Sequence, residues 1–86
     1  MNNTWTKKVV YKETWNNAEI IVYRHFVEDS GKEGYYTYDV FADDSCHYDP
    51  ICSSFAMEKS IAIRKAKDAH KRHYKFVEPG RVFEEK

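Results

Sequence analysis

The residues most suited to metal chemistry are two cysteines and three histidines, namely Cys46, His47, Cys52, His70 and His73. Thiolate and imidazole are ligands that zinc prefers, and two pairs of them are typical of a zinc finger. The spacing does not fit, because Cys52 precedes the predicted helix and His70 lies deep inside it, about 20 Å further along the axis at 1.5 Å per residue. Zinc ligands must converge within about 2.3 Å of the ion. We therefore predict no metal site and no cofactor.

A thiol nucleophile with a histidine base is the second chemical candidate. It would pair Cys46 or Cys52 with His47 or His25. Such catalysis needs a base within hydrogen-bond reach of the thiol and donors for an oxyanion. The side chains of neighbouring residues such as Cys46 and His47 usually point in different directions, and no thiol-enzyme signature surrounds them. We interpret the stretch as a loop with incidental thiols.

Paired carboxylates occur at Asp43, Asp44 and Asp49. A calcium loop requires regularly alternating oxygen ligands with a central glycine and a closing glutamate, and this stretch has neither. The sequence also contains no phosphate-binding glycine motif, no nucleophile elbow and no metalloprotease motif. We therefore predict a solvated acidic loop and a protein that is not an enzyme.

The charges are balanced overall but unevenly distributed. Fourteen basic residues match fourteen acidic ones, yet residues 55–76 contain seven basic and two acidic side chains. On a helical wheel, one face of this segment gathers the basic residues Arg64, Lys67, Lys71 and Lys75. Two interpretations stay open. The face is either a solvated surface that complements the carboxyl end of the helix dipole or a binding site for a polyanion.

Periodicity predicts the elements that position these residues. Lys7–Lys12, Glu19–Val27 and Tyr35–Phe41 are short and rich in β-branched and aromatic residues, so we predict three strands joined as an antiparallel meander. In the first strand, alternation places Trp5, Lys7, Val9 and Tyr11 on one face. In the second, it separates Ile20, Val22, Arg24 and Phe26 from Ile21, Tyr23, His25 and Val27.

The segment from Phe55 to Tyr74 contains neither Gly nor Pro and predicts one long helix, which Ser53 or Ser54 caps and Pro79-Gly80 ends. A stripe that includes Phe55, Ala62, Ala66 and Ala69 would pack on one face of the sheet. The predicted fold is therefore α+β, a three-stranded sheet followed by a helix in the order β-β-β-α, within one domain of 86 residues. Residues 81–83 are left as either a short strand or a tail.

The junction Phe55-Ala56-Met57-Glu58-Lys59-Ser60-Ile61 faintly resembles the start of the helix in plant ethylene-response-factor domains and in the amino-terminal DNA-binding domains of phage integrases. Met57 stands where those families carry a capping hydroxyl, and Ile61 where they carry a small residue. The resemblance covers about half of the chain and implies a sheet that binds DNA, whereas the sheet segment of this chain is acidic. Its size and aromatic content also resemble those of phage and mobile-element accessory proteins.

The aromatic content supports the leading functional hypothesis. Seven Tyr, five Phe and two Trp exceed what a three-stranded core absorbs, so one sheet face is predicted to bind a protein partner, while which face packs on the helix is left open. The predicted binding residues are Tyr23, His25, Tyr36 and Tyr38. We expect the protein to be a regulator or inhibitor and to be a monomer or homodimer. We also expect it to have no membrane segment and to reside in the cytoplasm, where its thiols stay reduced. The alternative is a nucleic-acid-binding domain that uses the basic helix face.

Overall fold

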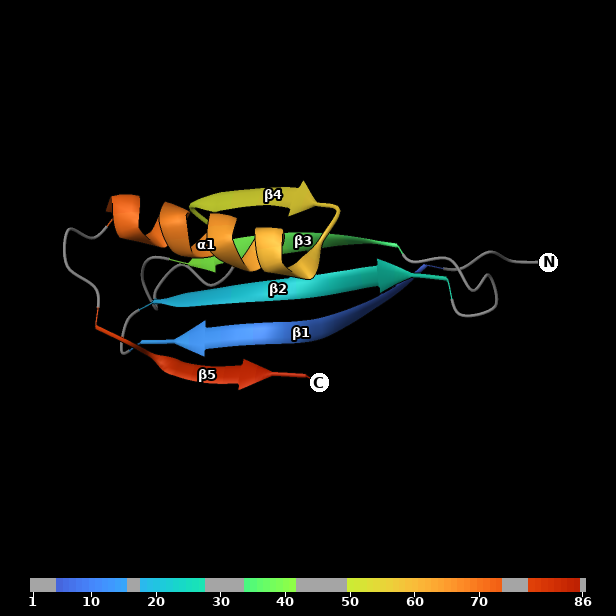
Figure 1. Ribbon diagram of the computed structural model, residues 1–86. Helices are drawn as coiled ribbons and strands as arrows, with labels where there is room; N and C mark the ends of the chain where they lie inside the picture. The colour runs from blue at the N-terminus through green and yellow to red at the C-terminus, as the bar shows by residue number, and fades with distance from the viewer. Residues whose placement is uncertain (1–4, 16–17, 28–33, 42–49, 74–77, 86) are drawn as a thin grey trace.

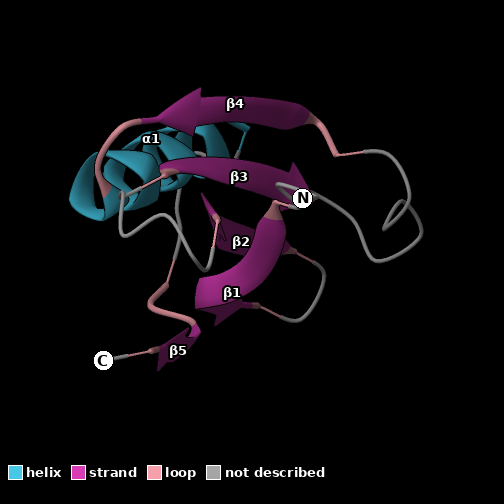
Figure 2. Ribbon diagram, turned by 90° about the vertical axis from the view of Figure 1, so that its right-hand side faces the viewer, coloured by secondary structure: helices cyan, strands magenta, loops and turns pink. Residues whose placement is uncertain are grey.

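A computed structural model describes residues 5–15, 18–27, 34–41, 50–73 and 78–85. These residues form β1 (Thr6–Thr14), β2 (Glu19–Phe26), β3 (Tyr35–Phe41), β4 (Cys52–Ala56), α1 (Lys59–His73) and β5 (Arg81–Glu84). The strands make one antiparallel sheet in the order β4-β3-β2-β1-β5, and α1 lies across one side of it (Figures 1 and 2). The predicted α+β class, antiparallel sheet and packed helix are confirmed. The prediction of three strands was wrong, because the described sheet has five.

The core lies between α1 and one sheet face. Alternation in β2 is as predicted, since Ile20 and Val22 are fully buried there together with Val40 of β3. The helix contributes the small side chains of Ala62, Ala66 and Ala69, all of them buried. Small residues let the helix backbone lie close to the sheet, and α1 contacts mainly β2, β3 and β4.

The helix begins at Lys59 rather than at Phe55. Residues 52–56 instead form β4, which pairs with β3 from Tyr36↔Ala56 to Val40↔Cys52. Residues 52–56 can form backbone hydrogen bonds with the edge of β3 only if they are extended, and they would lose these bonds as the first turn of a helix. Strand pairing therefore overrides the local helix propensity of this segment. Ser53 therefore does not cap the helix, and its hydroxyl instead donates to Asp39 Oδ1 at 2.7 Å.

The carboxyl-terminal segment, which the sequence left open, is a strand. β5 pairs with β1 from Tyr11↔Glu84 to Thr14↔Arg81. The buried Glu13 carboxylate ties this region together, because it accepts hydrogen bonds from the Tyr11 hydroxyl and the Gly80 N–H, both at 3.2 Å, and its Oε2 lies 3.9 Å from Lys67 Nζ. These contacts link β1, α1 and the segment that leads into β5.

An irregularity in β1 changes which side chains face the core. The register between β1 and β2 shifts between Val9 and Tyr11. Such a bulge breaks the simple alternation of a strand. Val9 is thus opposite Tyr23, while Tyr11 is opposite Val22 and is buried in the core with Val10. The expectation that Lys7, Val9 and Tyr11 share one face was therefore wrong for Tyr11.

Candidate functional site

The two faces of the sheet have different surroundings. One packs against α1, whereas no other described element lies over the opposite side, which we call the open face (Figure 2). Because residues opposite each other in an antiparallel sheet point to the same side, the register assigns the members of this face. They are Lys7, Val9, Lys12, Thr14, Glu19, Ile21, Tyr23, His25, Tyr35, Thr37, Asp39, Phe41, Ser53, Phe55, Arg81 and Phe83.

Aromatic rings gather at one end of the open face. The His25 and Tyr35 rings stack with centroids 4.7 Å apart and planes 5° apart, and the Trp5 ring lies 5.5 Å from Tyr35 at 57°. His25 Nε2 and Thr37 Oγ1 share a hydrogen bond of 2.7 Å, which fixes the imidazole. Stacked and tilted rings at these separations attract each other, so this end of the face is preorganised.

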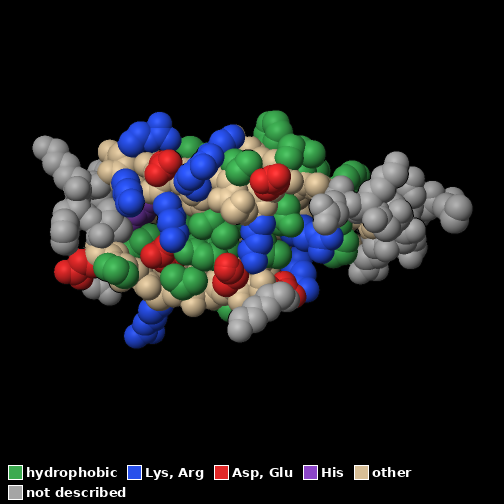
Figure 3. All heavy atoms as spheres, in the orientation of Figure 1, with side chains coloured by type: hydrophobic (Ala, Val, Ile, Leu, Met, Phe, Trp, Pro, Cys, Tyr) green, Lys and Arg blue, Asp and Glu red, His purple; other side chains and the backbone are tan. Residues whose placement is uncertain are grey.

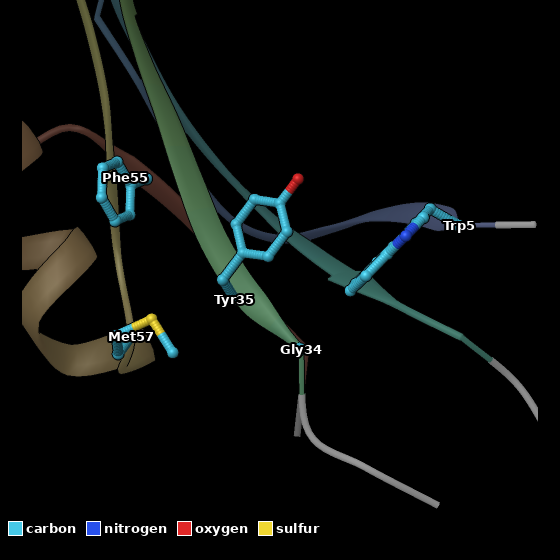
Figure 4. A pocket seen from close by; sticks show the side chains of 5 residues that line it. All are labelled: Trp5, Gly34, Tyr35, Phe55 and Met57. Carbon is cyan, nitrogen blue, oxygen red and sulfur yellow. The ribbon is translucent and has the colours of Figure 1, made fainter. Parts of the chain in front are cut away.

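An apolar recess adjoins these rings. It has a volume of about 460 Å³ and is lined by Trp5, Gly34, Tyr35, Phe55 and Met57. Figure 4 shows Tyr35 between Trp5 on one side and Phe55 with Met57 on the other. Trp5, Phe55 and Met57 are 55%, 61% and 68% exposed. Large apolar side chains around a hollow are typical of sites that receive an apolar group from a binding partner.

The electrostatic environment of the open face is mixed. Lys7 Nζ lies 4.1 Å from the centroid of the Tyr23 ring, a cation–π geometry. Burial raises the pKa of Tyr23, and the carboxylates of Asp39 and Glu19 raise it further. Burial lowers the pKa of His25 below its ordinary value of 6.5, and the Lys7 cation lowers it further. His25 is therefore neutral at pH 7, where it packs as an aromatic ring.

The lowered pKa of His25 predicts a pH dependence of stability. The folded state binds a proton at His25 less readily than the unfolded state, so this group's contribution to stability is lost as the pH falls below about 6.5. We expect the free energy of unfolding of the original chain, measured by urea denaturation, to fall between pH 7.5 and pH 5.5. The fall should be smaller for the His25→Gln variant, which lacks this titrating group. An NMR titration of the His25 ring with a midpoint at or above 6.5 would contradict this.

The structure separates the four residues predicted to bind a partner. Tyr23 and His25 lie on the open face, as alternation in β2 indicated. Tyr36 and Tyr38 point to the helix side, where Tyr38 is only 5% exposed within the core and Tyr36 packs against it. The four side chains therefore do not form one surface. The residues that join Tyr23 and His25 at the open face include Trp5, Tyr35 and Phe55.

The basic helix face is only partly free. Arg64, Lys67 and Lys71 are exposed, but Lys67 also lies 3.9 Å from Glu13 Oε2 and 5.6 Å from the Tyr11 ring centroid. Lys75 lies outside the described residues. Figure 3 shows Lys and Arg side chains over this side of the molecule with Asp and Glu side chains between them. The positive field over α1 is thus interrupted by carboxylates.

The chemical candidates are not brought together among the described residues. In that part of the chain, no group of three or more His, Cys, Asp or Glu side chains is arranged to hold a metal ion. Cys52 is a free thiol in β4, and His70 is buried in α1 with its ring stacked on Trp15 at 4.1 Å. The remaining candidates lie outside the described residues, namely Cys46, His47, Asp43, Asp44, Asp49 and the side chain of His73.

Comparison with known proteins gives no assignment. No protein-family model, no curated protein and no solved structure matches the chain. The junction of residues 55–61, which resembles the helix start of plant and integrase DNA-binding domains, runs from β4 into α1. Phe55 lies inside the strand and not at the start of the helix. Within the described residues, no helix is long and apolar enough to span a membrane.

Proposed function

We propose that this chain is a small non-enzymatic interaction domain, a regulator or inhibitor that acts by binding a protein through its open face. The observation that carries the proposal is the apolar recess beside the stacked His25 and Tyr35 rings. Aromatic residues and methionine are enriched in protein interfaces, and a few buried anchors supply most of the binding energy. The recess is open and apolar, so it suits an apolar anchor from a partner.

The open face supports this role better than the basic helix face supports nucleic-acid binding. A polyanion on α1 would compete with Glu13 for Lys67, and the chain has no net charge to attract it over a distance. Binding to nucleic acid through α1 would show a steep loss of affinity with salt, about 0.9 log units per log unit of salt for each phosphate contacted. It would also be abolished by Arg64→Glu together with Lys71→Glu.

Site-specific photo-crosslinking in the native cell tests the proposal. A photoreactive phenylalanine analogue replaces Phe55 in one chain and the exposed Arg64 in a matched control. We expect a discrete protein adduct only from position 55, weakened about tenfold by Tyr35→Ala, since that change removes an anchor ring. Lys71→Glu, on the helix, should leave the adduct unchanged. Adducts from position 64 alone, or tight salt-sensitive binding to DNA or RNA in a gel shift, would refute the proposal.

A further inference from the structure

The open face consists of two halves of opposite character on either side of β2. The half on β1 carries Lys7 and Lys12, separated by Val9, and Lys12 also lies 3.4 Å from the Glu19 carboxylate at the end of β2. The half on β3 carries Tyr35, Thr37 and Asp39. The register places Lys7 level with Tyr35 across His25, and Lys12 level with Asp39 across Ile21. A cation on one half therefore corresponds to a ring or a carboxylate on the other.

Each outer margin of the face carries one exposed apolar ring. Phe83 of β5 lies beside Lys12, and Phe55 of β4 lies beside Thr37. They are 53% and 61% exposed, which is unusual for side chains of this size. Each half of the open face thus ends in one exposed phenylalanine, so a surface that covers both halves would bury a ring at each margin.

We infer that the partner of the open face is a second copy of this chain, packed face to face about a two-fold axis that runs along β2. The inference rests on the proposed function, because it uses the same surface. Rotation about this axis places β1 of each copy over β3 of the other. Lys12 then lies opposite Asp39 of the second copy, and Lys7 lies opposite the Tyr35 ring of the second copy. A two-fold interface makes every such contact twice.

Sheet geometry is compatible with this arrangement. Face-to-face sheets pack about 10 Å apart with their strands within about 30° of parallel, so the halves still overlap when the sheets twist. Ile21 and Tyr23 of β2 lie on the axis and meet their own counterparts. Phe83 at one margin is carried over Ser53 of β4 in the second copy, two residues along the strand from Phe55. The two exposed rings then lie at the margins of the interface.

The available area and the charge allow a reversible dimer. Five strands about 4.8 Å apart and about seven residues long cover roughly 550 Å² per copy. Two copies then bury about 1,100 Å², near the lower end of specific interfaces, which indicates a dissociation constant in the micromolar range. With fourteen basic and fourteen acidic residues, two copies do not repel each other over a distance.

Charge reversal tests the inference. The molar mass is measured by sedimentation equilibrium at protein concentrations between about 1 and 200 μM, because this range brackets a micromolar dissociation constant. We expect Lys12→Glu alone, and Asp39→Lys alone, to weaken dimerisation about tenfold or more, since each places like charges opposite each other twice. An equimolar mixture of the two variant chains should restore the dimer, because each chain then meets the opposite charge on the other. Lys71→Glu, on the helix, is the matched control and should dimerise as the original chain does.

A second measurement guards against variants that fold poorly. Tyr23→Cys is placed on the proposed axis, in a background of Cys46→Ser and Cys52→Ser, and treated with a short bis-maleimide crosslinker. We expect efficient crosslinking into dimers, suppressed by Lys12→Glu, whereas Arg64→Cys in the same background should crosslink only slowly. Circular dichroism melting of each variant verifies that the chain is folded.

The outcomes separate this inference from the proposed function. Restoration of the dimer by mixing, with crosslinking at position 23, supports both. A monomer at 200 μM, or a dimer insensitive to Lys12→Glu and Asp39→Lys, overturns the inference. If position 55 then crosslinks to a different protein, the proposed function stands without it. A monomer whose open face crosslinks to no protein overturns both.

Discussion

Gly34→Ala is expected to lower the free energy of unfolding by about 2 kcal/mol or more, because a side chain at this position forces backbone apart. A Cβ atom on Gly34 would lie 1.5 Å from the carbonyl oxygen of His25 and 2.6 Å from its carbonyl carbon. Neither atom belongs to a flexible side chain, so β2 and β3 must separate where His25 faces Tyr35. Urea denaturation measures the loss.

A graded comparison makes this prediction specific. A Cβ on Gly80 would lie 2.7 Å from the Thr14 carbonyl oxygen and 2.9 Å from the Trp15 ring, so the overlap is smaller. Gly80→Ala should therefore destabilise the protein less than Gly34→Ala does. Since Gly34 also lines the recess, its substitution should perturb the NMR signals of Trp5 and Tyr35. Equal stability of the Gly34→Ala chain and the original would contradict the close approach of the two strands.

The sequence was sufficient for the elements that carry their own periodicity. β2 alternates cleanly, and Ala62, Ala66 and Ala69 recur at helical spacing, so the two faces of β2 and the buried stripe of α1 were predicted, whereas which face of β2 is buried was left open. β4 has no such pattern, because three of its five side chains are exposed. β5 is exposed at all four positions. These strands form because β3 and β1 offer unpaired backbone edges, and edge pairing leaves little trace in side-chain type.

The members of the candidate site on the open face could be predicted only in part, for a related reason. Tyr23 and His25 follow from alternation within one strand. Tyr35 joins them because the register between β2 and β3 sets it opposite His25, and pattern within one strand does not reveal register across a loop. The choice of Tyr36 and Tyr38 overlooked that they alternate in phase with Val40, a fully buried residue. That phase was the available signal that they face the core.

Truncation of the two tyrosines Tyr38 and Tyr23 should therefore lower the stability to very different extents. Tyr38→Ala leaves a cavity among core residues of the sheet and the helix, so we expect a loss of about 3 kcal/mol or more in the free energy of unfolding. Tyr38→Phe keeps the ring and should cost much less. Tyr23→Ala removes a half-buried ring from the open face and should cost about 1 kcal/mol or less.

The same pair distinguishes folding from binding in one experiment. Thermal melting and the molar mass at high concentration are measured for Tyr38→Phe and Tyr23→Ala, both of which should remain folded at room temperature. Because Tyr23 lies at the centre of the open face and Tyr38 lies beneath α1, only Tyr23→Ala should reduce association. Association that is lost with Tyr38→Phe and kept with Tyr23→Ala would show that partners bind on the helix side of the sheet, contrary to the proposal.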